Sequence, residues 1–339
     1  MNIVITGGAG FLGVRLARTL LEKGQLALAG AAVAQIDQIT LVDRAEPPAD
    51  LAKNPKVEVV VGDLNELLDK SRVKVVPKGT DVLFHLAAAV SGECEADFDL
   101  GMRSNFAATH GLLEACRALG SQPTFVFASS LAVFGNSPEQ PTPPLISDAT
   151  LPTPQSSYGI QKFIGEQMVA DYGRKGFVRG RTVRLMTVSV RPGRPNGAAS
   201  SFLSGMIREP LAGVRSQVPV SPETEVALSS PGRTIAGLIR AAETDDKTWG
   251  PRTAVNLPAI KTTVREMADA LDKVGGKEAA SMLEWKIDPP IAKIVATWPG
   301  NVESPRANKL GLTADENFEA IVREYVRENP DAVKLQAKQ

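Results

Sequence analysis

Apolar runs and helix-spaced apolar patterns alternate along the first half of the chain. The runs are rich in valine, isoleucine and leucine, and between them apolar residues recur at the spacing of a helix. Strands that are apolar throughout are typical of a parallel sheet covered by helices on both faces, so the pattern predicts a doubly wound α/β fold. The expected strands are residues 2–6, 38–43, 57–62, 82–87, 124–129 and 181–185, with a seventh at 254–257, and the clearest helices are 14–23 and 103–119.

A glycine-rich turn follows the first expected strand and precedes the first expected helix. Gly7 and Gly8 permit a tight turn, and Gly10 lets the backbone approach a ligand. Gly13 allows the helix to pack closely on the strand. The N-terminus of such a helix carries unpaired N–H groups and partial positive charge, which suit a pyrophosphate. Glycines alone are equally compatible with an ordinary loop, but the strand–turn–helix order favours a Rossmann-type dinucleotide site.

The second expected strand ends in an acidic residue, Asp43. A carboxylate in this place accepts hydrogen bonds from an adenosine ribose and repels a 2′-phosphate. The alternative for Asp43 is a solvated loop carboxylate, and Arg44 beside it leaves room for the phosphorylated cofactor. We interpret the glycine turn and Asp43 together as a site for NAD.

The alternation of strands and helices ends near residue 190. Residues 190–201 are rich in proline, glycine and serine, and scattered helical patterns follow, the last at 314–328. We therefore expect an NAD-binding domain at residues 1–189, rejoined by the chain at about 233–258. A smaller, mostly helical C-terminal substrate domain would comprise residues 190–232 and 259–339.

Composition narrows the classes of function. The 339-residue chain has 38 Lys and Arg residues and 38 Asp and Glu residues, so no strong field attracts nucleic acid or an anionic membrane. No apolar run is long enough to span a bilayer, and no leader pattern precedes the first strand. Cys94 and Cys116 form neither a metal-ligand cluster nor a disulfide framework, so no metal is expected. We expect a cytoplasmic protein that acts on a small molecule.

A tyrosine and a lysine four residues apart, Tyr158 and Lys162, project from one face of an expected helix. A free phenol has a pKa of about 10, and a neighbouring ammonium favours the phenolate, so Tyr158 is a candidate base. Ser130 ends a buried strand at its carboxyl edge, where open α/β sheets bind ligands, and is suited to hold a substrate hydroxyl. Alone, such a Tyr–Lys pair is typical of any helix face. Together with the glycine turn and Ser130, it predicts a catalytic set.

These features resemble the extended short-chain dehydrogenases/reductases, a branch of the NAD-dependent epimerase/dehydratase superfamily. The similarity spans nearly the whole chain and is carried by residues 6–13, Asp43, 62–64, 85–88, Asn105, 129–130, Tyr158 and Lys162.

The resemblance implies roles for further residues. Asp63 and Leu64 would contact the adenine, and Asn105 is similar to the family's helix asparagine near the active site. His85 is assigned no role. The implied cofactor contacts are Gly7, Gly10, Phe11, Leu12, Gly13, Asp43, Asp63, Leu64, Leu86, Ala87, Ala88, Asn105, Tyr158 and Lys162.

The resemblance also implies a homodimer, since relatives usually pair through the two helices that follow Arg103 and Tyr158. Phe106, Leu112 and Leu113 are candidates for an apolar seam between the subunits. Each of the three is equally compatible with facing its own sheet.

Two departures from the family's better-known members narrow the activity. Residues 129–131 are Ser-Ser-Leu where the dehydratases resemble one another in a Thr-Asp-Glu, so dehydration is disfavoured. The segments at 184–194 and 229–237 differ from those with which the epimerases bind a nucleotide-sugar diphosphate, so a smaller substrate is expected. A redox-sensing module that holds NAD without turnover is a further alternative, which the complete Ser-Tyr-Lys set disfavours.

Residues 90–102, 190–202 and 208–213 are similar to the D-erythronate dehydrogenases of this superfamily. That resemblance implies NAD-dependent oxidation of the 2-hydroxyl of a four-carbon sugar acid, and the alternative is a nucleotide-sugar 4-epimerase that retains NAD. Arg191 or Arg194 would bind the carboxylate, because guanidinium groups bind carboxylates bidentately. Each candidate is also compatible with a solvated loop or a helix cap. The candidate substrate residues are Ser91, Glu93, Ser130, Arg191, Arg194, Asn196, Ser200 and Ser201.

Overall fold

The computed structural model describes residues 1–193 and 198–336, and the chain divides into two compact units. The predicted division into an NAD-binding and a substrate domain, with boundaries near 189, 232 and 258, stays a prediction. Among the described helices, none combines the length and the apolarity that crossing a membrane requires. The first unit comprises Met1–Val133, Ser156–Arg184 and Ile235–Val255, and the second comprises Phe134–Gln155, Leu185–Thr234 and Asn256–Gln339.

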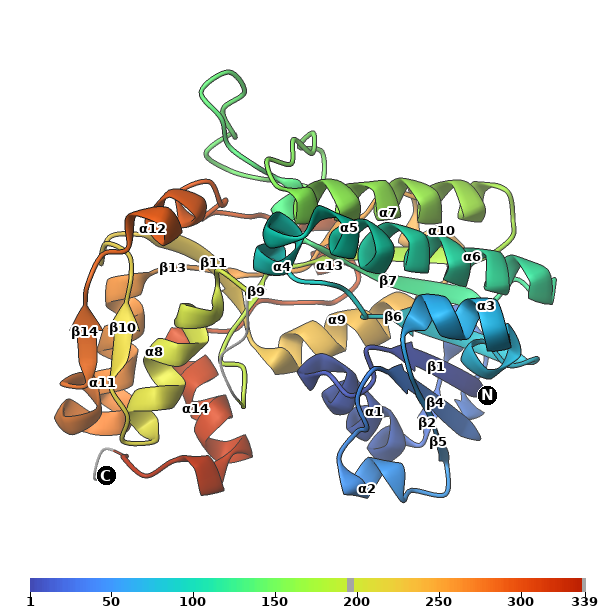
Figure 1. The fold of residues 1–339 in the computed structure, drawn as a ribbon, viewed down its shortest axis with the longest axis horizontal. Helices are drawn as coiled ribbons and strands as arrows, with labels where there is room; N and C mark the ends of the chain where they lie inside the picture. The colour runs from blue at the N-terminus through green and yellow to red at the C-terminus, as the bar shows by residue number, and fades with distance from the viewer. Residues whose placement is uncertain (194–197, 337–339) are drawn as a thin grey trace. The chain divides into compact units, whose positions relative to one another are not determined.

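The first unit is built on a seven-stranded sheet (Figure 1). The direction in which strands are added reverses between β1 and β6, which pair in parallel with Thr6 opposite His85. In open α/β sheets, ligands bind at the carboxyl ends of the strands beside such a reversal. The predicted doubly wound, Rossmann-type fold is therefore confirmed. The strands in spatial order are β5 (Val57–Val61), β4 (Gln38–Asp43), β1 (Asn2–Thr6), β6 (Thr80–His85), β7 (Thr124–Ser130), β8 (Arg179–Leu185) and β12 (Val255–Asn256).

Helices cover both faces of this sheet. Figure 1 shows α3 (Leu64–Val75), α6 (Ala108–Leu119) and α7 (Ser157–Arg174) on one face, and α1 (Phe11–Lys23) and α2 (Ala49–Ala52) on the other. Leu112 and Leu113 of α6 are fully buried in the same core cluster as Val4 and Phe125 of the sheet. These two leucines therefore face their own sheet and form no seam on the surface. The remaining elements of this unit are β2 (Gln25–Leu26), η1 (Leu28–Gly30), β3 (Ala34–Gln35), α4 (Ser91–Ala96), α5 (Phe98–Gly101), η2 (Met102–Ala107), η3 (Leu131–Val133) and α10 (Asp246–Trp249).

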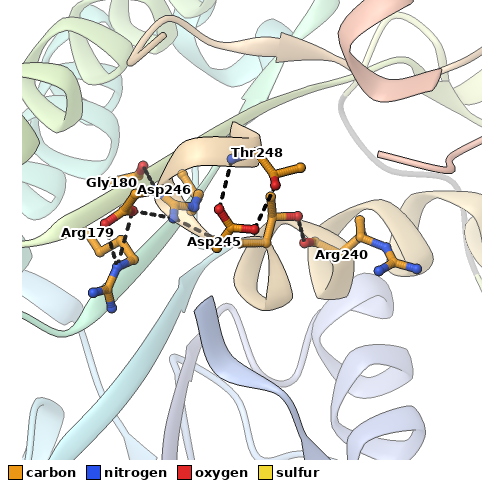
Figure 2. Close-up of polar contacts among 8 residues, drawn as sticks. Arg179, Gly180, Arg240, Asp245, Asp246 and Thr248 are labelled. Atoms are coloured by element: carbon orange, nitrogen blue, oxygen red, sulfur yellow. Dashed lines mark hydrogen bonds and ion pairs between the residues drawn. The ribbon is translucent and has the colours of Figure 1, made fainter. Parts of the chain in front are cut away.

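A polar cluster ties β8 to α10 (Figure 2). The Arg181 guanidinium lies 5.1 Å from the centre of the Trp249 ring and donates to Asp246 over 2.6 Å. Asp245 caps α10, since its carboxylate accepts from the Thr248 N–H over 2.9 Å. These contacts fix the amino-terminal end of β8. Ligands bind open α/β sheets at the other, carboxyl-terminal ends of the strands.

The second unit has its own hydrophobic core. The predicted helix at 314–328 begins only at Phe318, because the Asn317 side chain caps it by accepting from the Ala320 N–H. Three helices dominate the core: α8 (Ser201–Leu211), α11 (Val264–Ala280) and α14 (Phe318–Glu328). The other elements are β9 (Thr187–Val188), β10 (Ser216–Val218), β11 (Glu225–Ser229), α9 (Pro231–Glu243, which continues into the first unit), β13 (Ile260–Thr263), β14 (Leu283–Trp285), α12 (Pro289–Val295), α13 (Pro305–Lys309) and η4 (Pro330–Ala332).

Candidate active site

The glycine turn between β1 and α1 leaves no room for side chains. Gly7 has φ +72°, and a Cβ there would lie 2.8 Å from the Ala87 nitrogen, in the segment that follows β6. A Cβ on Gly13 would lie 2.1 Å from the Gly7 carbonyl oxygen. Because real Cβ atoms never approach backbone atoms so closely, both positions require glycine. The turn therefore brings the start of α1, β1 and the end of β6 into direct contact.

The N-terminus of α1 fits an anionic group. Gly10 is its N-cap residue and offers no side chain to the first-turn N–H groups, and the first turn contains no acidic residue. The N–H groups of Phe11, Leu12 and Gly13 thus have no acceptor within the helix and point out of its N-terminus, beside a turn whose glycines present backbone without side chains. The residues present fit the diphosphate of a dinucleotide.

Asp43 and Asp63 lie at the carboxyl ends of neighbouring strands. The Asp43 carboxylate accepts from the Ala9 N–H in the glycine turn over 2.9 Å. Asp63 caps α3 by accepting from the Asn65 N–H over 3.0 Å. Arg44 donates to Asp63 over 2.6 Å. This is the arginine that, in the sequence, leaves room for the phosphorylated cofactor. Burial opposes ionisation of Asp63, but Arg44 and the backbone N–H groups outweigh it and lower the pKa of the carboxyl.

Ser130, Tyr158 and Lys162 stand on two adjacent elements, β7 and α7. Ser130 is the last residue of β7, and its hydroxyl accepts from the Ala132 N–H over 3.1 Å. The Lys162 ammonium lies 5.7 Å from the centre of the Tyr158 ring and donates to the Ala128 carbonyl over 2.9 Å. The lysine thus links the tyrosine's helix to the strand that carries Ser130.

Lys162 is completely buried, and its surroundings set its charge. Burial lowers the pKa of Lys162 to about 8, against the opposing influence of Cys94 and Glu166. The lysine therefore stays protonated at neutral pH. His85 is also buried, and burial together with the Lys162 charge lowers its pKa to about 3. This neutral histidine bridges Thr6 and Thr109 of the core, which is a structural role.

Asn105 connects the segment after β6 with α7. It lies in a π-helical turn, η2, where the sequence predicts regular helix. Its amide accepts from the Ala89 N–H over 2.9 Å and donates to Gln161 over 2.8 Å. Gln161 is buried next to Lys162, and sequence reasoning missed it. The sequence signal that could have identified Gln161 is its position as a polar residue on the inward face of the expected helix.

Ser91 and Glu93 open α4. Glu93 accepts from the Val90 N–H over 2.9 Å and so acts as a helix cap. This contact corresponds to the structural alternative for Glu93.

In the second unit, the N-cap residue of α8 and two residues within this helix, spaced four apart, hold Arg191. The Arg191 guanidinium donates to the Ser200 hydroxyl over 3.1 Å, and its backbone N–H donates to Ser204 over 3.0 Å. Arg208, itself buried, donates to the Arg191 carbonyl over 2.8 Å. Sequence reasoning missed Ser204 and Arg208 in this role, although their spacing places them on one helix face. The position of Arg191 is thus fixed at both backbone and side chain.

The remaining substrate candidates are placed only in part. Ser201 is the first residue of α8. Arg194 and Asn196 lie outside the described residues. Ser91 and Glu93 belong to the first unit, whereas Arg191, Ser200 and Ser201 belong to the second.

The chain is similar to known proteins over nearly its whole length. The NAD dependent epimerase/dehydratase family matches residues 3–226. The chain is 47% identical over 328 residues to the D-erythronate dehydrogenase of Cupriavidus necator, covering 97% of this chain and 98% of that protein. It is 40% identical over 326 residues to the D-erythronate dehydrogenase of Haemophilus influenzae, covering 96% and 99%. A crystal structure described as a nucleoside-diphosphate-sugar epimerase from Agrobacterium tumefaciens is similar with a TM-score of 0.88 and 37% identity, covering 98% and 95%.

Proposed function

The chain belongs to the NAD dependent epimerase/dehydratase family, and from this premise we propose that it is an NAD-dependent dehydrogenase of a small sugar acid. The proposed reaction converts the 2-hydroxyl of D-erythronate to a 2-oxo group. One observation carries the proposal. The Lys162 ammonium is buried beside the Tyr158 ring at the end of the strand that bears Ser130, in a chain similar over nearly its whole length to two D-erythronate dehydrogenases.

The chain's own residues hold the cofactor in this proposal. The first-turn N–H groups of α1 bind the diphosphate, and the Asp43 carboxylate binds the adenosine ribose hydroxyls. Lys162 holds the ribose next to the nicotinamide. When bound, NAD supplies the acceptor for the hydride that leaves C2 of the substrate.

Proton transfer is the chemistry that the chain itself performs. The Tyr158 oxygen, as phenolate, takes the proton of the 2-hydroxyl while C2 loses its hydride and becomes a carbonyl carbon. The Lys162 ammonium favours this phenolate through its charge. Ser130 donates a hydrogen bond to the substrate oxygen and so fixes its direction toward Tyr158.

Arg191 is the proposed partner of the substrate carboxylate. Its guanidinium and backbone are held by Ser200, Ser204 and Arg208, so little side-chain freedom is lost when it binds an anion. A guanidinium held in this way fits the carboxylate of a sugar acid.

A nucleotide-sugar 4-epimerase is the second candidate, because the A. tumefaciens structure, 37% identical to this chain, is described as an epimerase. The two functions differ in the fate of the hydride taken from the substrate: a dehydrogenase leaves it on NADH, whereas an epimerase returns it to the sugar. A dehydrogenase releases NADH when purified protein is mixed with NAD and D-erythronate, and NADH absorbance reports it directly. Absence of NADH together with interconversion of UDP-glucose and UDP-galactose would overturn the proposal in favour of the epimerase.

A further inference from the structure

The proposed mechanism does not use a buried ion pair that lies one helical turn after Lys162 on α7. Glu166 and Arg184 have side-chain exposures of 2% and 5%. The guanidinium of Arg184 donates to both carboxylate oxygens of Glu166, over 2.8 and 2.7 Å. The Ser129 hydroxyl donates to the same carboxylate over 2.5 Å. Glu166 therefore joins three elements: its own helix α7, strand β8 and strand β7.

The residues that hold this ion pair lie on the same two elements as the candidate catalytic residues. Glu166 follows Lys162 by one helical turn on α7 and Tyr158 by two. Ser129 directly precedes Ser130 on β7. α7 lies close against β7, because a Cβ on Gly165 would meet the Phe127 ring at 2.5 Å. A helix held so closely cannot rotate or slide without moving the groups at its N-terminal end.

Packing alone does not require charges here. Removing two charges from water costs free energy that their attraction often fails to return, and apolar replacements of buried pairs are frequently neutral or stabilising. A bidentate pair does, however, fix direction and distance more tightly than an apolar contact. We propose that Glu166 and Arg184 are positioning residues: they hold α7 so that Tyr158 and Lys162 meet Ser130, and they balance the charge around the Lys162 ammonium. This inference rests on the proposed Ser130–Tyr158–Lys162 chemistry.

The charge balance follows from the groups that face Lys162. These groups are Cys94 from α4, His85 from β6, and Tyr158 and Glu166 from α7, while Arg184 on β8 faces Glu166. His85 is neutral, and burial raises the pKa of the Cys94 thiol, which keeps it protonated at neutral pH. At neutral pH the carboxylate of Glu166 thus supplies the negative charge that stabilises the ammonium, and Arg184 attenuates it. Cys94 adds to this stabilisation only at higher pH, where its thiol ionises.

Neutralising each partner separately gives opposite results. In Glu166→Gln, the lysine loses its counter-charge and faces a buried cation, so it should lose its proton about one pH unit lower than in the wild type. In Arg184→Met, the full carboxylate charge acts on Lys162, and the titration midpoint should rise. The double variant Glu166→Gln/Arg184→Met should return the midpoint close to that of the wild type, with a lowered kcat because the bidentate restraint is gone.

The experiment follows the ¹³Cε signal of Lys162 across a pH titration of the full-length protein labelled with ¹³C-lysine, assigned with a Lys162→Met variant. The matched control is Asp246→Asn, which breaks the contact to Arg181, a buried arginine of the same strand, and should leave the Lys162 midpoint unchanged. If Arg184→Met is insoluble, Ser129→Ala takes its place. It removes one hydrogen bond from Glu166 and should raise the midpoint.

The outcomes separate this inference from the proposed function. The titration needs no substrate, so the charge balance around Lys162 is tested independently of whether D-erythronate is oxidised, whereas the restraint on α7 is tested by kcat. Opposite shifts in the two single variants, with the alkaline limb of kcat moving in the same order, support the positioning pair. Shifts in one direction, or unmoved midpoints alongside reduced activity, would reduce the pair to a structural contact and overturn the inference.

Discussion

Replacing Lys162 by methionine should stabilise the fold while it impairs catalysis. Burial lowers the pKa of Lys162 from 10.5 to about 8. At neutral pH the folded state therefore holds the ammonium at a cost of about 3 kcal/mol relative to the unfolded chain. Methionine removes this cost but also removes the hydrogen bond to the Ala128 carbonyl and the contact with Phe127, so a net gain of about 1–2 kcal/mol in the free energy of unfolding is expected.

The same substitution removes the charge that favours the Tyr158 phenolate. With the 5.7 Å between the ammonium and the Tyr158 ring centre taken as the charge separation, an effective dielectric constant of about 20 gives about 3 kcal/mol. This energy corresponds to about two pKa units. At neutral pH the variant should therefore turn over about 100-fold more slowly, and its activity should recover as the pH is raised toward the pKa of an ordinary phenol.

Urea unfolding at several pH values, together with NADH formation from D-erythronate, measures both effects. Between pH 8 and 10.5 the unfolded wild type binds more protons at this lysine than the folded protein does, so wild-type stability rises with pH relative to the variant. Wild type should gain about 2.5 kcal/mol relative to the variant between pH 7 and pH 10, so the stability difference should close and the variant should be the less stable protein at pH 10. A variant that is less stable at neutral pH, or a difference that does not change with pH, would refute the reasoning.

Three further predictions concern binding. Arg191→Met should raise KM for the sugar acid about 10- to 100-fold and leave the Kd of NAD unchanged, as measured by steady-state kinetics and calorimetry; an unchanged KM would exclude Arg191 as the carboxylate partner. Gly13→Ala places a Cβ 2.1 Å from the Gly7 carbonyl oxygen, so NAD binding should fall at least about tenfold in a titration, with a lowered Tm; wild-type affinity would show that the turn does not hold the diphosphate. Asp43→Asn removes the charge that repels a 2′-phosphate, so the ratio of NADP to NAD turnover should rise, whereas a constant ratio would assign the preference elsewhere.

Local patterns predicted the parts of the fold that local sequence determines. β1, the glycine turn and α1 are recognisable because the turn needs glycine wherever it occurs, and the spacing of Tyr158 and Lys162 determines that they share a helix face. The π-helical turn at Asn105 was not predictable. It comes with contacts to Ala89 and Gln161, which lie 16 and 56 residues away.

The Glu166–Arg184 pair escaped sequence reasoning for a similar reason. In the sequence, Glu166 and Arg184 each resemble a charged residue on the surface. Only the packing of α7 against β8 shows that both side chains are buried and paired. Likewise, Leu112 and Leu113 were compatible with the surface or the core until the rotation of α6 about its axis was known. The roles of the substrate candidates remain predictions, because they depend on a bound ligand.

The most direct test of the proposed chemistry compares wild type and Tyr158→Phe in one assay, with NADH formation from NAD and D-erythronate followed alongside the Kd of NAD. The wild type should form NADH in step with the 2-oxo acid. The variant should bind NAD with nearly the same Kd but form no NADH, since the only atom removed is the oxygen that accepts the proton. Wild-type rates in Tyr158→Phe would contradict the account.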